Sequence, residues 1–311
     1  MKDRYICFLD LLGTKSIAGS DPNQYSNIIS NFEDIVKDSA KVYSKVECHL
    51  FSDSIYSEAC CLTDLCNFVK ALRNKLLPKK ICFNAAIRRG ALGIHKDSIG
   101  DNGEILSIKS TDAIEVYSQQ VKFSGAGIYV EETLINDPDI SDMLVDSIYT
   151  SLEKDKLKIH KFKDIKLSYG SADALKYILH IFIETYILNP RASRYYLTMI
   201  ATFLNEEWRF DSEKGEEIIN HILNACRVLG DDAYREAVVL TLVNAICTHA
   251  YCNRGNVDDA YEEARDSLES VEDALDYLKL ISLSNVDSML LKDSSKAIIS
   301  KFLTWRALKR E

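Results

Sequence analysis

Near residue 168 the spacing of the apolar residues changes, and this change limits the folds that are open to the chain. Before that point, short apolar runs typical of strands alternate with stretches that carry helical spacing. From about residue 171 the strand patterns stop, and apolar residues recur every three to four positions in one segment after another, from 172–188 to 296–309. We therefore predict an α+β domain over residues 1–168 and an all-helical domain over residues 171–311.

The predicted elements of the first domain follow one another in a mixed order. Strands are predicted at 4–10, 46–51, 54–60, 81–94, 104–108 and 125–132, helices at 22–44, 62–77 and 111–122, and a hairpin at 149–162. The Gly and Asp residues of "KDSIGDNG", residues 96–103, favour a turn between two of these strands.

The second domain is expected to regulate the first or to assemble an oligomer. One of its predicted helices covers residues 271–283. Tyr251, Gly255 and Ala260 have the spacing of a helix-turn-helix unit of the tetratricopeptide kind, but only one such unit is visible in the sequence. The domain is therefore interpreted as a helical bundle or as a tetratricopeptide-like fold.

Composition narrows the environment and the partners. A net charge of −9 disfavours binding to duplex nucleic acid. The sequence has no run of about 18 apolar residues and no apolar leader at its N-terminus, so we expect no membrane association and a cytoplasmic location. The nine cysteines show no metal-ligand spacing and are expected to be reduced, mostly as small core residues.

Two aspartates stand at the ends of apolar strands. Asp10 closes the run "YICFL", and Asp53 lies in the turn of "HLFSDSIYSE" between two strands. Taken alone, Asp53 suits a solvated turn, whereas a carboxylate buried in an apolar strand needs a hydrogen bond, a counter-charge or a metal. If the two strands are neighbours, both carboxylates lie at one edge of a sheet and are able to share a hard cation such as Mg²⁺.

The turn after Asp10 has the composition of a phosphate-binding junction. Backbone N–H groups at the start of a helix favour phosphate, and this stretch is placed where a strand gives way to a helix. We therefore assign Leu12, Gly13, Thr14, Lys15 and Ser16, together with Ser52 and Tyr117, to a candidate nucleotide site.

The order of these motifs resembles a known family. The stretch "FLDLLGTK", the hairpin "FSDS" 43 positions after Asp10, "IRRGALGI" and "STDAIEVYSQQVKFSGAGIYVEE" are similar to the catalytic palm of class III nucleotidyl cyclases over residues 5–130. The resemblance implies a ferredoxin-like βαββαβ core and two Mg²⁺ or Mn²⁺ ions held by Asp10, Asp53 and the carbonyl of Leu11. It also implies conversion of a nucleoside triphosphate to a cyclic nucleotide in a homodimer.

The chain departs from the family pattern at two places. Ser52 stands where these cyclases have glycine, and the helix at 111–122 lacks the arginine that stabilises the transition state. Arg88 or Arg89 would supply the missing charge as a catalytic residue. Alternatively, the domain resembles the divergent palms of bacterial antiviral signalling, which include pyrimidine cyclases and palms that form cyclic oligonucleotides, or it is a catalytically inactive nucleotide-binding or scaffold protein.

Overall fold

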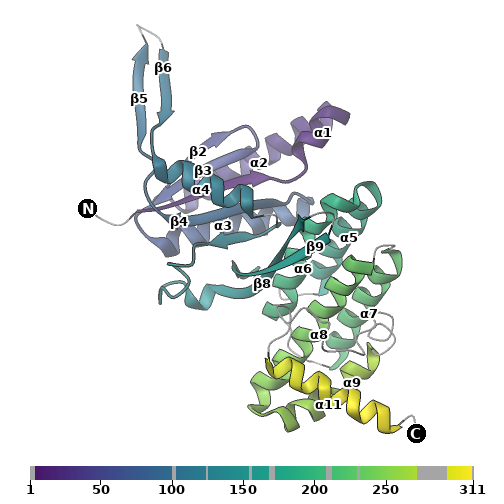
Figure 1. Ribbon diagram of the computed structural model, residues 1–311. Coiled ribbons are helices and arrows are strands. Elements are labelled where there is room, and N and C mark those ends of the chain that lie inside the picture. The colour runs from purple at the N-terminus through teal and green to yellow at the C-terminus, as the bar shows by residue number, and fades with distance from the viewer. Residues whose placement is uncertain are drawn as a thin grey trace. The chain divides into compact units, whose positions relative to one another are not determined.

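The computed structural model forms two compact units (Figure 1). It describes residues 4–99, 103–123, 125–153, 156–167, 172–207, 212–229, 232–271 and 293–309. The first unit comprises Met1–Val145 and Phe162–Ser168, and the second comprises Asp146–Lys161 and Tyr169–Glu311. The chain therefore enters the second unit, returns to the first and leaves it again.

The first unit is built on a five-stranded sheet with the strand order β2-β3-β1-β4-β7. Its strands are β1 (Tyr5–Leu11), β2 (Val46–Phe51), β3 (Ser54–Ala59), β4 (Phe83–Arg89) and β7 (Ile128–Val130). β1 runs antiparallel to both of its neighbours, and β7 runs parallel to β4. The first four strands and their helices give the βαββαβ order, which confirms the predicted α+β palm.

Two helices, α2 (Pro22–Val42) and α3 (Leu62–Leu76), pack against one face of this sheet. Successive side chains of a strand point to opposite faces, so Cys7, Leu9 and Leu11 join the core beneath these helices. A short helix, α1 (Thr14–Ser20), connects β1 to α2, and a 3₁₀ turn, η1 (Leu77–Lys79), follows α3.

Helix α4 (Thr111–Lys122) covers part of the opposite face. Ile6 and Phe8 of β1 form a smaller apolar cluster with Ala113 and Val116 of this helix. Asp10 continues the same even-numbered side of β1. It therefore lies on the face of α4 and not within the larger core.

Strands β5 (Ile94–Ile99) and β6 (Gly103–Ile108) form a separate hairpin that projects from the sheet (Figure 1). The turn predicted at 96–103 is wrong over most of its length, because residues 96–99 belong to β5 and residue 103 begins β6. Pairing between the strands, from Ile94 opposite Ile108 to Ile99 opposite Gly103, overrides the local turn composition.

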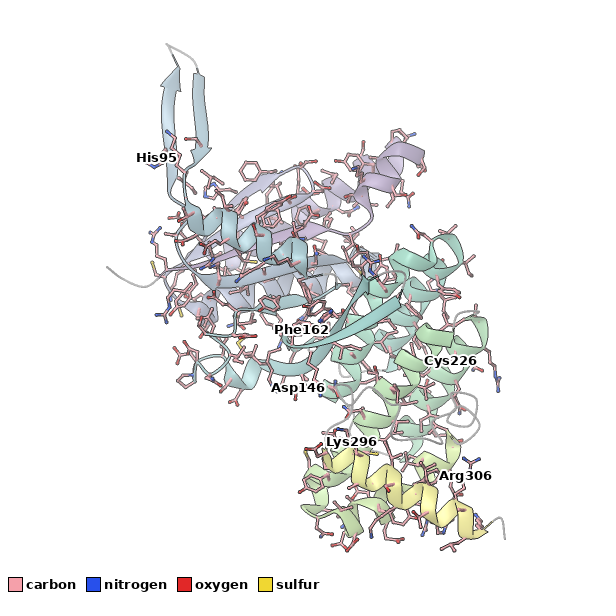
Figure 2. The ribbon with its side chains drawn as sticks, viewed as in Figure 1. His95, Asp146, Phe162, Cys226, Lys296 and Arg306 are labelled. Atoms are coloured by element: carbon pink, nitrogen blue, oxygen red, sulfur yellow. The ribbon has the colours of Figure 1, made fainter. Side chains whose placement is uncertain are left out.

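The predicted hairpin at 149–162 is confirmed and is longer than expected. It consists of β8 (Leu144–Glu153) and β9 (Lys156–Ile165), with the 3₁₀ turn η3 (Ser141–Met143) before it. Phe162, labelled in Figure 2, belongs to the first unit, and its ring lies 4.7 Å from that of Phe123 and 6.3 Å from that of Tyr129.

The second unit contains residues 146–161 of the β8–β9 hairpin, and its other described elements are helices. Its helices are α5 (Ala172–Leu188), α6 (Pro190–Glu207), α7 (Ser212–Val228), α8 (Asp232–Arg254), α9 (Val257–Ser270) and α11 (Asp293–Lys309). Gly255, with φ 74°, lies between α8 and α9. Beyond residue 271 the helix predicted at 271–283 lies outside the described residues. None of the described helices combines the length and the apolar character needed to cross a membrane.

Candidate nucleotide and metal site

Asp10 is the last residue of β1 whose side chain lies on the face of the sheet that α4 covers. The register places Ser54 of β3 opposite it on one side and Asn84 of β4 opposite it on the other. Ser54 Oγ donates a hydrogen bond of 2.6 Å to Asp10 Oδ1. The half-buried carboxylate is therefore held by a hydroxyl from the neighbouring strand, which restricts its rotation.

Asp53 is the second residue of the two-residue turn between β2 and β3. Thr14 Oγ1, at the start of α1, donates to Asp53 Oδ2 at 2.6 Å, and the N–H of Leu11 donates to the carbonyl oxygen of Asp53 at 3.0 Å. These bonds fix the β2–β3 turn against the end of β1. The structure thus brings Asp10 and Asp53 to the same edge of the sheet.

Ser52 precedes Asp53 with φ 55°, in the left-handed region that glycine adopts without cost. Its hydroxyl shares a hydrogen bond of 2.8 Å with the hydroxyl of Tyr25. The requirement for a left-handed backbone explains why a glycine is expected at this turn, and serine keeps the conformation at the cost of local strain.

The two carboxylates interact electrostatically. Burial raises the pKa of Asp10 above its usual value, and the charge of Asp53 raises it further, whereas the hydrogen bond from Ser54 lowers it. Within the described chain, neither carboxylate forms an ion pair with a lysine or an arginine. Carboxylate oxygens without a basic partner are a suitable donor set for a hard divalent cation.

The oxygen donors available at this edge are few. The carbonyl oxygen of Leu11 lies 3.5 Å from Thr14 Oγ1, whose single hydrogen is engaged by Asp53 at 2.6 Å. No group of three or more His, Cys, Asp or Glu side chains able to hold a metal occurs among the described residues. Two carboxylates and a carbonyl suit Mg²⁺ or Mn²⁺ only when substrate phosphates and water complete the coordination, as is usual for Mg²⁺.

A polar row extends from Asp10 across β4, and sequence analysis did not identify it. Asn84 is buried opposite Asp10, donates to the carbonyl oxygen of Phe123 at 3.1 Å and accepts a hydrogen bond from Gln120 of α4. A buried asparagine within the strand "FNAAI" was the signal that would have found this network, since a buried amide needs partners.

The turn after Asp10 contributes fewer free N–H groups than predicted. The N–H of Leu12 donates to the carbonyl oxygen of Cys82 at 2.8 Å, and that of Ser16 donates to Gly13 at 3.1 Å, because α1 begins at once. Gly13 adopts φ 81° and leaves open space where a side chain would project. The exposed Lys15 and the N-terminal turn of α1 remain the positive features beside the carboxylates.

The structure does not bring Arg88 and Arg89 to the carboxylates. They lie opposite Ile6 and Tyr5, four to five residues from Asp10 along β1, which corresponds to roughly 13–17 Å. Arg88 is 15% exposed and pairs with Glu115 of α4, and its Nη2 lies 3.7 Å from Glu131. Within this chain neither arginine supplies the charge that the resemblance requires.

Tyr117 lies closer to the site. It belongs to α4, is 48% exposed, and its ring centre lies 5.3 Å from that of Phe8, two residues before Asp10. Phe8 also contacts Tyr56 of β3, with a distance of 4.6 Å between ring centres. An aromatic cluster therefore lies next to the row that contains Asp10.

No protein-family model and no curated protein matches the sequence. Among solved structures, the chain is similar to the guanylyl cyclase Cya2, with 11% identity, coverage of 52% of this chain and 91% of that chain, and a TM-score of 0.39. The guanylate cyclase domain of RhGC from Catenaria anguillulae, in complex with GTP, shows 11% identity, 52% and 96% coverage, and a TM-score of 0.38. An adenylate cyclase from Trypanosoma brucei, in its monomeric state, shows 8% identity, 54% and 96% coverage, and a TM-score of 0.40.

Proposed function

We propose that the chain is a divergent nucleotidyl cyclase that converts a nucleoside triphosphate to a cyclic nucleotide signal. The observation that carries this proposal is the pairing of Asp10 and Asp53 at one edge of the sheet. Each carboxylate is held by a hydroxyl of the same unit, and neither is neutralised by a basic side chain within the described chain. Such a pair is costly unless a cation binds there.

Each residue of the site has a role in the proposed reaction. Asp10, Asp53 and the carbonyl of Leu11 would hold two Mg²⁺ or Mn²⁺ ions, while Ser54 and Thr14 keep the two carboxylates oriented. When bound, divalent ions activate the attacking hydroxyl and neutralise phosphate charge. The 3′-oxygen forms a bond to the α-phosphorus, the bond to pyrophosphate breaks, and the hydroxyl proton passes to water. Lys15 and the first turn of α1 would bind the triphosphate.

The resemblance requires a positive charge that stabilises the transition state, and we assign this charge to a second copy of the chain. Arg88 is engaged by Glu115 and Glu131 in its own unit, so it does not neutralise charge at Asp10. Helix α4 beside the site exposes Ile114, Tyr117 and Val121, an apolar stripe suited to a homodimer interface. A cytoplasmic role in antiviral signalling is part of the same proposal.

Purified protein with Mn²⁺ and each of the four nucleoside triphosphates tests the proposal. We expect pyrophosphate release with at least one of them, and mass spectrometry of the product separates a cyclic mononucleotide from a cyclic oligonucleotide. Asp10→Asn and Asp53→Asn should each reduce the rate at least 100-fold, because each removes a charged ligand. Asp38→Asn, an exposed change on α2, is the matched control and should retain wild-type turnover.

A second candidate function is nucleotide binding without turnover. One observation favours it, namely that Arg88 lies away from the two carboxylates. If each triphosphate with Mn²⁺ raises the melting temperature but no pyrophosphate is released, the chain is a nucleotide sensor or scaffold. Absence of both effects with all four nucleotides would contradict both functions.

A further inference from the structure

A pocket of about 320 Å³ lies between α9 and α11 of the second unit. It is lined by Tyr261 of α9 and by Ser300, Lys301, Thr304, Trp305 and Leu308 of α11. The last four of these lie three or four positions apart and therefore share one face of α11. The volume is at the lower end of the range for small-molecule sites, roughly 300–1,000 Å³.

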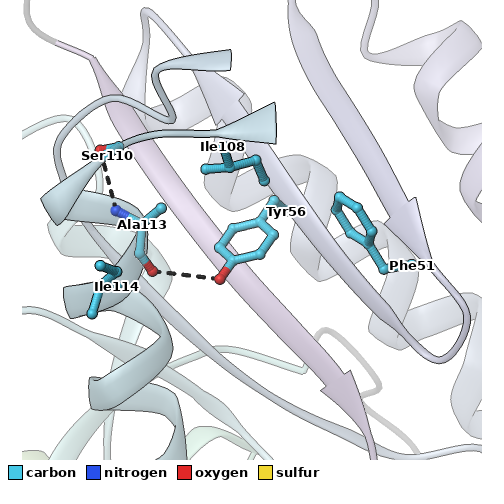
Figure 3. A pocket seen from close by; sticks show the side chains of 6 residues that line it. All are labelled: Phe51, Tyr56, Ile108, Ser110, Ala113 and Ile114. Atoms are coloured by element: carbon cyan, nitrogen blue, oxygen red, sulfur yellow. Dashed lines mark hydrogen bonds between the residues drawn. The ribbon is translucent and has the colours of Figure 1, made fainter. Parts of the chain in front are cut away.

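The hydroxyl of Tyr261 distinguishes this pocket. The residue is 7% exposed, and within the described chain its hydroxyl has no hydrogen-bond partner. A pocket of about 300 Å³ in the first unit differs in this respect (Figure 3). There Tyr56 Oη donates to the carbonyl oxygen of Ala113 at 3.5 Å, and Ser110 Oγ accepts from the N–H of Ala113 at 3.3 Å. A buried hydroxyl without a partner costs free energy, which a ligand that bonds to it would recover.

The apolar wall of the pocket comes from α11. The ring of Trp305 lies 5.7 Å from that of Phe302, which is fully buried, so the indole is held against the core. Leu308, one turn later, is 69% exposed. An aromatic ring and an exposed aliphatic side chain around a hollow favour a ligand with a flat ring.

Lys301 places a positive charge beside Tyr261. Its Nζ lies 6.0 Å from the centre of the Tyr261 ring and forms an ion pair with Asp258. The side chains of Lys301 and Asp258 are 44% and 77% exposed, and an exposed pair of this kind is weak. Since an ammonium group has three hydrogens, Lys301 is able to donate to an anionic ligand as well.

The surrounding carboxylates limit the charge of that ligand. Lys309 Nζ lies 4.5 Å from the centre of the Trp305 ring and 3.8 Å from Glu269, so both lysines already have an acidic partner. Burial raises the pKa of Tyr261, and the charge of Glu262 raises it further, so the hydroxyl keeps its proton at neutral pH. A second negative charge on the ligand would be repelled by these carboxylates.

We propose that this pocket binds a small molecule with one planar ring and a single negative charge. The ring lies against Trp305 and Leu308, and the anionic group accepts hydrogen bonds from Lys301 and from the hydroxyl of Tyr261. Cyclic mononucleotides and aromatic carboxylates share this chemistry. Binding here needs neither Asp10 nor Asp53 and therefore does not depend on the proposed function.

Calorimetric titration of the full chain with a chelator tests the proposal, because the carboxylate site then holds no divalent ion. The probes are cyclic AMP, cyclic UMP and benzoate, with their neutral analogues adenosine, uridine and benzyl alcohol, and ribose 5-phosphate, which has no planar ring. We expect at least one of the three charged ring compounds to bind. Its affinity should exceed that of its neutral analogue and of ribose 5-phosphate by about tenfold or more.

Tyr261→Phe keeps the ring and removes the hydroxyl. It should weaken binding about fivefold without lowering the melting temperature, because the hydroxyl has no partner among the described residues. Trp305→Ala should weaken binding by about tenfold or more. Tyr177→Phe is the matched control, since Tyr177 is 46% exposed on α5, and it should leave the dissociation constant unchanged.

The probes also identify the source of the ligand. Binding of a cyclic mononucleotide would assign the pocket to nucleotides, and binding of benzoate alone would assign it to aromatic carboxylates. Absence of binding for all three, or binding that neither Tyr261→Phe nor Trp305→Ala weakens, would overturn the proposal. Turnover with Mn²⁺ is measured separately, so these outcomes leave the proposed function standing.

Discussion

Asp10 is more costly to ionise in the folded chain than in an unfolded one. Burial and the charge of Asp53 raise its pKa, so its contribution to stability is complete below the usual aspartate value of 3.8 and is lost as the pH rises through the folded value. The folded state holds the proton more tightly, and ionisation at neutral pH therefore lowers the free energy of unfolding. This cost is what a bound cation would offset.

The first prediction is that Asp10→Asn stabilises the metal-free protein at pH 7. Asparagine still accepts the hydrogen bond from Ser54 but carries no charge, so we expect the melting temperature to rise by roughly 1–3 °C. The gain should shrink as the pH falls toward 3, where wild-type Asp10 is protonated. Thermal melts with a chelator at several pH values measure this difference.

Asp38 gives a control of opposite sign. A hydrogen bond from Lys41 lowers the pKa of Asp38, so its contribution to stability is present above the usual aspartate value and is lost on acidification. Asp38→Asn should therefore show no gain at pH 7. A gain for Asp10→Asn that is independent of pH would show that charge is not its cause.

Thr14 is predicted to position Asp53. The residue is 4% exposed and its hydroxyl donates to Asp53 at 2.6 Å, so Thr14→Val keeps the shape of the residue and removes one hydrogen bond to a carboxylate. We expect Mn²⁺ affinity to fall about tenfold. Thr14→Ser restores the donor and should recover most of the affinity. Equal affinities of the valine and serine variants would rule out the positioning role.

At the scale of elements, a buried ion pair connects α3, β7 and β9. Arg73 Nη1 lies 3.0 Å from Asp164 Oδ1, with side chains 5% and 0% exposed. Asp164 also accepts the N–H groups of Ile128 and Ile165 at 2.9 and 2.7 Å. The pair therefore attaches the last strand of the first unit to its central helix and sheet.

Removal of the arginine should destabilise the protein strongly. Arg73→Met leaves the buried carboxylate of Asp164 without its counter-charge, which typically costs about 3–5 kcal/mol. Lys37→Met is the control, because Lys37 and its partner Glu33 are both exposed and such pairs contribute about 0.5 kcal/mol or less. Urea denaturation measures both, and a loss below about 1 kcal/mol for Arg73→Met would contradict the prediction.

Local patterns predicted most elements of the first unit, but they did not predict register. The apolar run at 4–10 predicted β1, because the apolar pattern of a buried strand is contained in its own sequence. The distance from Arg88 to Asp10 depends on how β4 pairs with β1, and that pairing is not local. Likewise, Lys96 and Asp97 have turn composition, yet pairing with β6 places them in β5. The aspartate pair was predicted because Asp10 lies at the end of its own apolar run and Asp53 lies in the turn of a hairpin, and both features are local.

At the scale of the whole molecule, the chain passes between the two units three times, after Val145, after Lys161 and after Ser168. The change of apolar spacing near residue 168 coincides with the last passage. The sequence holds no signal for the first two. Residues 146–161 group with the helices although they form a hairpin. Ser147, 2% exposed, bonds within the second unit to the carbonyl oxygen of Thr198 at 3.2 Å and to the hydroxyl of Thr202 at 2.7 Å. The spacing of apolar residues distinguishes helices from strands, but it does not show to which compact unit a segment belongs.

The last prediction concerns two fragments of the first unit. Residues 1–168 alone carry residues 146–161 without the helix that binds Ser147, so we expect partial aggregation and a lower melting temperature. In the second fragment a short glycine-containing turn replaces residues 146–161. It should be monodisperse in sedimentation and should bind a 3′-deoxynucleoside triphosphate with Mn²⁺, since Asp10 and Asp53 both precede the cut. If the shortened fragment is insoluble and the longer one is soluble, residues 146–161 belong to the first unit.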